Sequence, residues 1–151
     1  MVFIDDSTHA QMASTRVLPG DVLLNITGAS IGRVAIAPPD LSEANVNQHV
    51  SIIRPTDELS ARFLMYWISQ PSVQSLINNE QKGATRQGFT KAQIEGLQIP
   101  EVKMWEQEEI VGTLDAGIQK IDSLAPLGVA SLKELDALLP SVLDKAFKGE
   151  L

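Results

Sequence analysis

The sequence contains no cysteine and only two histidines, His9 and His49. The absence of cysteine excludes disulfides, thiolate metal sites and cysteine nucleophiles, and it is compatible with a cytoplasmic protein. The two histidines do not stand at a metal-ligand spacing such as H-x-x-x-H, so we expect no metal site and no cofactor. No apolar run approaches the roughly 20 residues that cross a bilayer, and the chain from Met1 onward lacks the basic and apolar regions of a signal peptide.

Positive charge is scarce as well. The net charge is −7, from 12 Lys or Arg against 19 Asp or Glu. Residues 101–151 hold five bases and ten acids, a balance of −5, and the first 100 residues hold seven and nine, a balance of −2. This acidity argues against bulk attraction to nucleic acid, so DNA binding would need a local basic patch or basic partner subunits. One such patch exists, since residues 82–91, "KGATRQGFTK", carry three bases and no acid.

Short β-rich runs dominate the first half of the chain. Residues 2–5 could form a strand and residues 6–15 have the composition of a polar loop. Strands are predicted at Asp21–Thr27, Val34–Ala37 and His49–Arg54, the last two closed by prolines that cannot donate to a ladder.

Helical periodicity follows these strands. Apolar residues between Leu59 and Ile68 predict a helix with Thr56 as its N-cap, and Pro71 starts a second helix. Thr90 to Gln93 form a capping box that predicts a short third helix, and Leu97–Pro100 predicts a strand.

The loop Gly28–Gly32 first suggests a phosphate-binding turn. Such turns work because their glycines lead into a helix, whose free N–H groups meet the anion. Here Gly32 leads into the β-branched run "RVAIA", which favours a hairpin connection with glycines at positive φ. A loop that presents Ser30 and Arg33 to a partner such as a nucleic-acid backbone stays open as an alternative.

The last third has a heptad pattern typical of a coiled coil. Apolar residues recur at alternating steps of three and four between Val111 and Ala146, and a helix over residues 105–148 would be roughly 66 Å long. Pro126 costs about 3 kcal/mol inside a helix, so we expect a kink or a break near Leu124–Gly128, and a hairpin is an alternative. The residues expected to face another helix are Val111, Leu114, Ile118, Ile121, Leu132, Leu135, Leu139 and Val142.

Five motifs occur in a fixed order: "GDVLLNITGASIGRVAI", "NVNQHVSIIRP", "FLMYWI", "KGATRQGFTKAQIEGLQIP" and "EQEEIV", the last opening the helix that ends "LLPSVLDKAFKGEL". Together they resemble the specificity (S) subunit of type I restriction–modification systems. The resemblance implies an α+β fold, with a partial target recognition domain over residues 1–100 and a helical conserved region over 101–151. It also implies a non-catalytic protein that recognises half of a split DNA sequence and holds the modification and restriction subunits. Since a full-length subunit carries two such units, this chain would act as a homodimer or pair with another S-subunit helix.

Candidate DNA contacts follow from side-chain chemistry. Guanidinium and amide groups can recognise guanine and adenine edges, and hydroxyls and lysines can hold phosphates. Arg86 and Gln87 are candidates for base edges, and Lys82, Thr85 and Lys91 for the backbone, whereas a solvated loop is the alternative. Further candidates are Ser30, Arg33, Asn47 and Gln48, although Asn and Gln before a strand commonly satisfy loop backbone groups.

Two further functions stay open beside DNA recognition. A truncated domain that no longer binds DNA could still dimerise, or compete for the modification subunit, through the helix. A nucleotide-binding enzyme would bind ATP or a dinucleotide, and we expect neither, because the sequence has no P-loop and no paired carboxylates beside a nucleophile. Glu106 and Gln107, at the start of the long helix, match a pair in the family, and simple helix capping is the favoured interpretation.

Overall fold

The structure, a computed structural model, describes residues 5–79 and 88–148. The chain divides into two compact units, Met1–Val111 and Gly112–Leu151, which are described separately below. Of the strand predicted at residues 2–5, residues 2–4 lie outside the described residues, as do Lys82, Thr85, Arg86 and Gln87, and Asp5 is not in a strand.

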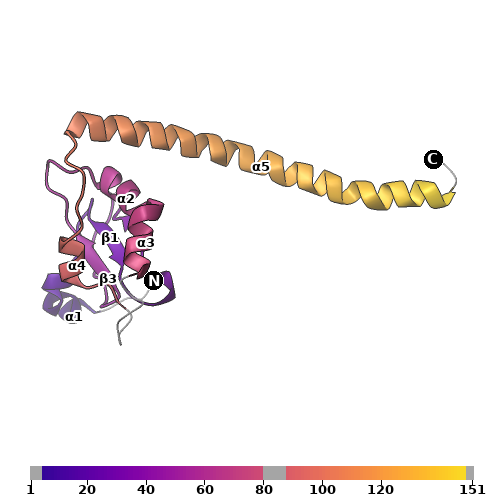
Figure 1. Cartoon of the computed structure of the whole chain (residues 1–151). Coiled ribbons are helices and arrows are strands. Elements are labelled where there is room, and N and C mark those ends of the chain that lie inside the picture. The colour runs from indigo at the N-terminus through magenta and orange to yellow at the C-terminus, as the bar shows by residue number, and fades with distance from the viewer. Residues whose placement is uncertain (1–4, 80–87, 149–151) are drawn as a thin grey trace. The chain divides into compact units, whose positions relative to one another are not determined.

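A three-stranded antiparallel sheet forms the centre of the first unit (Figure 1). Its strands are β1 (Val22–Asn25), β2 (Val34–Ile36) and β3 (Val50–Ile53), in the order β2-β1-β3. Val22 lies opposite both Ile36 and Ile53, which sets the register of all three strands. The three strand predictions in this region are confirmed, and the fold is α+β.

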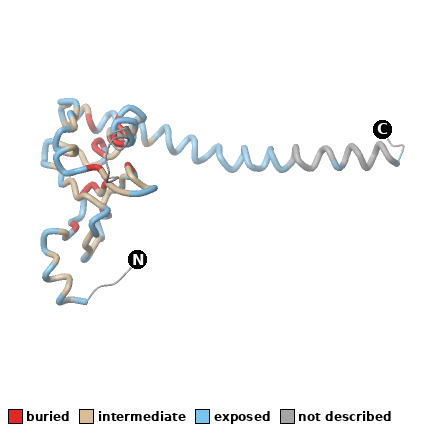
Figure 2. Tube along the Cα trace, turned by 60° about the horizontal axis from the view of Figure 1, so that its bottom comes forward, coloured by how far each residue is buried: buried red, intermediate tan, exposed pale blue. Residues whose placement is uncertain are grey.

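Two helices cover one face of this sheet. They are α2 (Ala61–Ser69) and α3 (Pro71–Asn79), the second beginning at the predicted proline. The core joins Val22, Leu24, Leu64, Ile68, Val73, Ile77 and Phe89, all buried (red in Figure 2). The predicted N-cap Thr56 is wrong, because α2 begins later and the Ser60 side chain accepts a hydrogen bond from the Phe63 N–H.

Two local predictions near the chain's polar segments have different outcomes. Residues 6–15 are not a plain loop, since α1 (Asp6–Gln11) and a 3-10 turn (Ala13–Thr15) form there. Asp5 caps α1 by accepting from the Thr8 N–H, so capping rather than apolar periodicity makes this helix. The capping box at Thr90 is confirmed and opens α4 (Lys91–Glu95).

Leu97–Pro100 is not a strand. Leu97 and Ile99 pack against the core, but within the described part of the chain their backbone pairs with no neighbouring strand. This apolar run therefore contributes side chains to the core without joining the sheet.

The long C-terminal helix is α5 (Met104–Lys148), which continues through Pro126 and Pro140. The break or hairpin expected near Leu124–Gly128 is therefore wrong. Pro126 removes the hydrogen bond to the Asp122 carbonyl, but a 45-residue helix keeps its remaining ladder on both sides. Of the helices in residues 5–79 and 88–148, none is long and apolar enough to cross a membrane.

Candidate nucleic-acid interface

The antiparallel sheet brings three loops that are distant in sequence to one end of its strands, where β1 finishes. We call this end of the sheet the loop edge. The hairpin loop leaves β1 after Asn25, and the segment entering β3 meets the same end, because Asn25 lies opposite Val50. The Ile26 N–H donates to the His49 carbonyl at 2.8 Å, and the Phe89 N–H donates to the Ile26 carbonyl at 2.8 Å. The end of β1 is therefore the meeting point of segments more than 60 residues apart in sequence.

The hairpin loop between β1 and β2 is held against α3. Gly28 and Gly32 have φ of 69° and 81°, which confirms the predicted hairpin with left-handed glycines. The Gln74 amide donates to the Gly32 carbonyl and to the Ile68 carbonyl, each at 2.9 Å. Glycine is favoured at position 32 because φ is positive there, and an added Cβ would also displace the end of the Gln74 side chain. Within this anchored loop Ser30 is half-buried and Arg33 is exposed.

Polar side chains before β3 extend the loop edge. Asn47 accepts a hydrogen bond from the His49 N–H at 3.0 Å, and the hydroxyl of Thr27 shares one with Nδ1 of His49. Gln48 approaches the other ring nitrogen of His49 at 3.4 Å. Asn47, Gln48 and His49 are all exposed. Sequence reasoning missed Thr27 and His49, since nothing in the local sequence indicates that the two side chains meet.

Asn45, in the same sequence motif, has a structural role instead. Its amide donates to the Met12 carbonyl at 2.8 Å and to the Thr15 hydroxyl at 3.1 Å, and its carbonyl oxygen meets Nδ1 of His9. This amide therefore fixes the α1 segment, and the interpretation of loop-backbone satisfaction holds for it.

The basic segment is attached to the loop edge. Gly88 pairs with Thr27 in an isolated antiparallel bridge, and Phe89 is buried in the core. Lys91, at the start of α4, is strongly exposed and lies 3.5 Å from Glu95. Lys91 also lines a hollow of about 480 Å³ together with Ile26 and Val50, which places it beside the end of β1. Of the residues proposed from sequence, Ser30, Arg33, Asn47 and Gln48 thus lie on loops that converge here, and Lys91 lies beside them at the start of α4.

An ion pair between the buried Asp21 and the half-exposed Arg54 lies at the opposite end of the sheet. Both guanidinium nitrogens Nε and Nη2 of Arg54 donate to the Asp21 carboxylate, at 2.7 and 2.8 Å, and the Leu18 N–H donates to it at 2.7 Å. Burial raises the pKa of Asp21, but the bonds from Arg54 and Leu18 together outweigh it, so the pKa lies below its ordinary value. This pair joins the start of β1 to the end of β3 and is a structural element.

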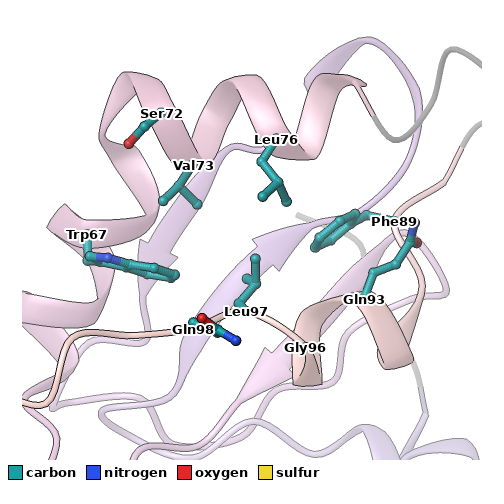
Figure 3. A pocket seen from close by; sticks show the side chains of 9 residues that line it. All are labelled: Trp67, Ser72, Val73, Leu76, Phe89, Gln93, Gly96, Leu97 and Gln98. Carbon is teal, nitrogen blue, oxygen red and sulfur yellow. The ribbon is translucent and has the colours of Figure 1, made fainter.

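An apolar hollow of about 500 Å³ lies between α3 and α4 (Figure 3). Trp67, Val73, Leu76 and Leu97 line it, and the ring of Phe89 lies at one end. The half-buried ring of Trp67 packs against the core cluster here. Two glutamine side chains, Gln93 and Gln98, provide its polar rim, and no group in it is placed for catalysis.

Helix α5 has an exposed apolar stripe, formed by Leu114, Ile118, Ile121, Leu124, Val129 and Leu132, which we call the α5 stripe. Their side chains are 41–67% exposed, and α5 is pale blue along this part in Figure 2. Val111, also proposed for the interface, is instead buried within the first unit. The side chains of Leu135, Leu139 and Val142 lie outside the described part of the structure.

Comparison with known proteins identifies the family. The model of the type I restriction modification DNA specificity domain matches residues 10–126. The chain belongs to this family. Specificity subunits are the non-catalytic component of such systems, and the first unit corresponds to a target recognition domain.

Three relatives illustrate the match. The chain is 30% identical over 149 residues to the type I restriction enzyme EcoBI specificity subunit of Escherichia coli, covering 98% of this chain and 31% of that protein. A chain from a structural study of complex assembly and conformational transition of the type I R-M system superposes with a TM-score of 0.69 at 28% identity, covering 91% of this chain and 33% of the other. The HsdS subunit from Thermoanaerobacter tengcongensis gives 0.61 at 28% identity, covering 90% and 31%. The chain thus spans about a third of the length of these relatives.

Proposed function

We propose that this chain recognises one half-site of a split DNA sequence and that α5 pairs with a second α5, or with another specificity-subunit helix, as the spacer between half-sites. The observation that carries the proposal is the meeting of three loops at the end of β1. These loops hold Arg33, Gln48 and the attachment of the basic segment, in a chain that belongs to a DNA specificity family.

The chemistry of the loop edge suits duplex DNA. Arg86 and Gln87 would contact base edges in the major groove, where guanidinium and amide groups can form paired hydrogen bonds. Lys82, Thr85 and Lys91 would hold phosphates, and Ser30, Arg33, Asn47 and Gln48 would extend the contact along the duplex. Thr27 and His49 join this set, because they lie between the hairpin loop and Gln48.

Assembly would compensate for the acidity of the chain. With a net charge of −7, a single copy gains little from general attraction to phosphates. Modification and restriction subunits held by the chain would add both DNA contacts and catalysis, as a cytoplasmic complex of the kind studied for its structural relative. The α5 stripe supplies the apolar surface for pairing.

A selection from random duplex DNA, followed by gel shifts at fixed salt, tests the recognition proposal. Both would use the chain alone and the chain with its modification subunit. We expect Arg86→Ala to weaken binding to the selected sequence by roughly 10-fold or more, since a good base contact contributes about 1–3 kcal/mol. Lys120→Ala, which removes one charge from the exposed surface of α5, is the control. Equal affinity of Arg86→Ala and the wild type would remove the base-contact assignment.

A second function, an interaction module without DNA binding, is favoured by one observation. The α5 stripe is exposed between Leu114 and Leu132, and the chain spans about a third of the length of its relatives. This function predicts pairing, or competition for the modification subunit, without any selected DNA sequence. The same selection therefore separates the two functions.

A further inference from the structure

Gln107 is one of two polar residues buried in the described core, with 2% of its surface exposed. The other is Asp21, whose partner is a charged side chain. A buried amide costs free energy unless its groups are hydrogen-bonded, so its partners show what it holds together.

All the hydrogen bonds of the Gln107 side chain go to the backbone of other segments. Its Oε1 accepts from the Ser60 N–H at 2.8 Å, and its Nε2 donates to the Glu58 carbonyl at 2.9 Å and to the Val102 carbonyl at 2.7 Å. Ser60 caps α2, and Val102 lies just before α5. One side chain therefore ties the first turn of α5 to the segment that starts α2.

Its neighbour Glu106 has a different role. The Glu106 carboxylate accepts from the Lys103 N–H at 3.2 Å, which caps its own helix. Sequence analysis favoured helix capping for both residues, and the structure supports that interpretation for Glu106 alone. The partners of Gln107 lie 47 and 49 residues earlier in the chain, so no local pattern could indicate them.

We infer that Gln107 is a positioning residue that fixes the first turn of α5 against the segment that starts α2. The inference rests on the proposed function for its purpose, since α5 is the helix proposed as the spacer between half-sites and Gln107 holds the place where that helix begins. A methionine at position 107 would keep the length of the side chain and lose all three hydrogen bonds.

Distance measurements between two spin labels test this inference without DNA. The chain has no cysteine, so Ser75→Cys on α3 and Glu108→Cys near the start of α5, both at exposed positions of the unit Met1–Val111, introduce the sole two labelling sites. We expect a narrow distance distribution in the otherwise wild-type chain, and a distribution at least twice as wide, or a shifted mean, in Gln107→Met. The measurement is made well below the melting temperature, so that both proteins are folded.

Two controls separate orientation from stability. Ile77→Val perturbs the same domain in its buried core without touching the α5 attachment, and Glu106→Ala removes only the cap of α5. Both should keep the narrow distribution. A broad distribution in the wild type, or an unchanged one in Gln107→Met, would overturn the inference.

A DNA measurement then links the inference to the proposed function. Duplexes carrying two copies of the selected half-site at varied spacer lengths are bound by the wild type and by Gln107→Met. The variant should accept a spacer range wider by several base pairs, with unchanged affinity for a single half-site. If the wild type binds none of these duplexes, the proposed function fails while the distance result stands on its own; if both proteins prefer the same narrow spacer range, the positioning role fails.

Discussion

The domain and the long helix treat the same kinds of residue in opposite ways. In the unit Met1–Val111, Val22, Leu24 and Ile68 are buried completely by neighbours from the same chain. In α5 beyond Val111, the leucines and isoleucines of the α5 stripe are 41–67% exposed. Burying such a side chain contributes roughly 1.5–3 kcal/mol, so the first unit obtains a stabilisation that the exposed side chains of the α5 stripe do not. Under the proposed function, a partner helix would cover the α5 stripe.

The largest expected effect comes from substitutions in the α5 stripe that prevent pairing. Ile118→Glu with Ile121→Glu would place four carboxylates in a paired α5 interface, so we expect dimer affinity to fall on the order of 10⁴-fold or more. The domain should melt as before, because both side chains are exposed in the single chain. Analytical ultracentrifugation measures the first effect and thermal unfolding the second. A large fall in the melting temperature of the domain, accompanying the fall in dimer affinity, would contradict the separate roles of the domain and the α5 stripe.

The next largest effect comes from removing the ion pair between Arg54 and Asp21 in the domain. Arg54→Ala leaves the buried Asp21 carboxylate with the Leu18 N–H as its remaining partner among the hydrogen bonds described above, so the free energy of unfolding should fall. The loss should be smaller than for a fully buried pair, because the Arg54 side chain is half exposed. Asp21→Asn, which removes the charge itself, should cost less. Urea unfolding followed by tryptophan fluorescence checks both, and an Asp21→Asn loss larger than that of Arg54→Ala would contradict this account.

Glycine substitutions should have opposite signs in the two regions. Gly32→Ala forces alanine to a φ of 81° and into the Gln74 side chain, so it should destabilise the domain by roughly 2 kcal/mol or more. Gly28→Ala has open space and isolates the cost of positive φ, about 1 kcal/mol. Gly112→Ala, inside α5 with open space around it, should stabilise the helix by about 1 kcal/mol. Thermal unfolding of the three variants, followed by circular dichroism, tests these predictions. Equal losses of stability for Gly28→Ala and Gly32→Ala would contradict a contribution from the Gln74 side chain.

Low pH should have the smallest effect, lowering the stability of the domain while leaving the pairing of α5 unchanged. The pKa of Asp21 in the folded domain lies below its ordinary value of 3.8, so its stabilisation is complete above pH 4 and is lost as pH falls through the folded pKa. Hydrogen bonds from Ser7 and Thr8 likewise lower the pKa of Asp5 to about 2, so the cap of α1 weakens over the same range. The α5 stripe has no titratable group, and pairing should persist. Unfolding and mass measurements between pH 5 and pH 2 check this, and a domain more stable at pH 2 than at pH 5 would contradict the sign.

Local rules predicted much of the domain, and the errors have physical causes. Gly28 and Gly32 indicated the hairpin, and the Thr90 capping box indicated α4, because each depends on neighbours within a few residues. Thr56 and Ser60 are both competent caps, and packing of Phe63 and Leu64 into the core selects the later one. The helix through Pro126 shows that a single lost hydrogen bond does not end a long helix.

The candidate site was predictable in composition and not in geometry. Residue chemistry indicated Arg33, Gln48 and Lys91, and the loop edge follows only from the pairing of β1 with β3. The contacts of Gln74 and Gln107 cross more than 40 residues, and each joins a side chain to backbone groups. Such contacts have no signature in sequence spacing, because any glutamine is chemically able to make them.

The molar mass of the purified chain across a range of concentrations tests the central claim most directly. The exposed α5 stripe predicts a mass that rises toward twice the 16.4 kDa of one chain, or a stable complex with another specificity-subunit helix where one is supplied. A mass that stays at one chain up to high concentration, with no complex formed on addition of that helix, would contradict it.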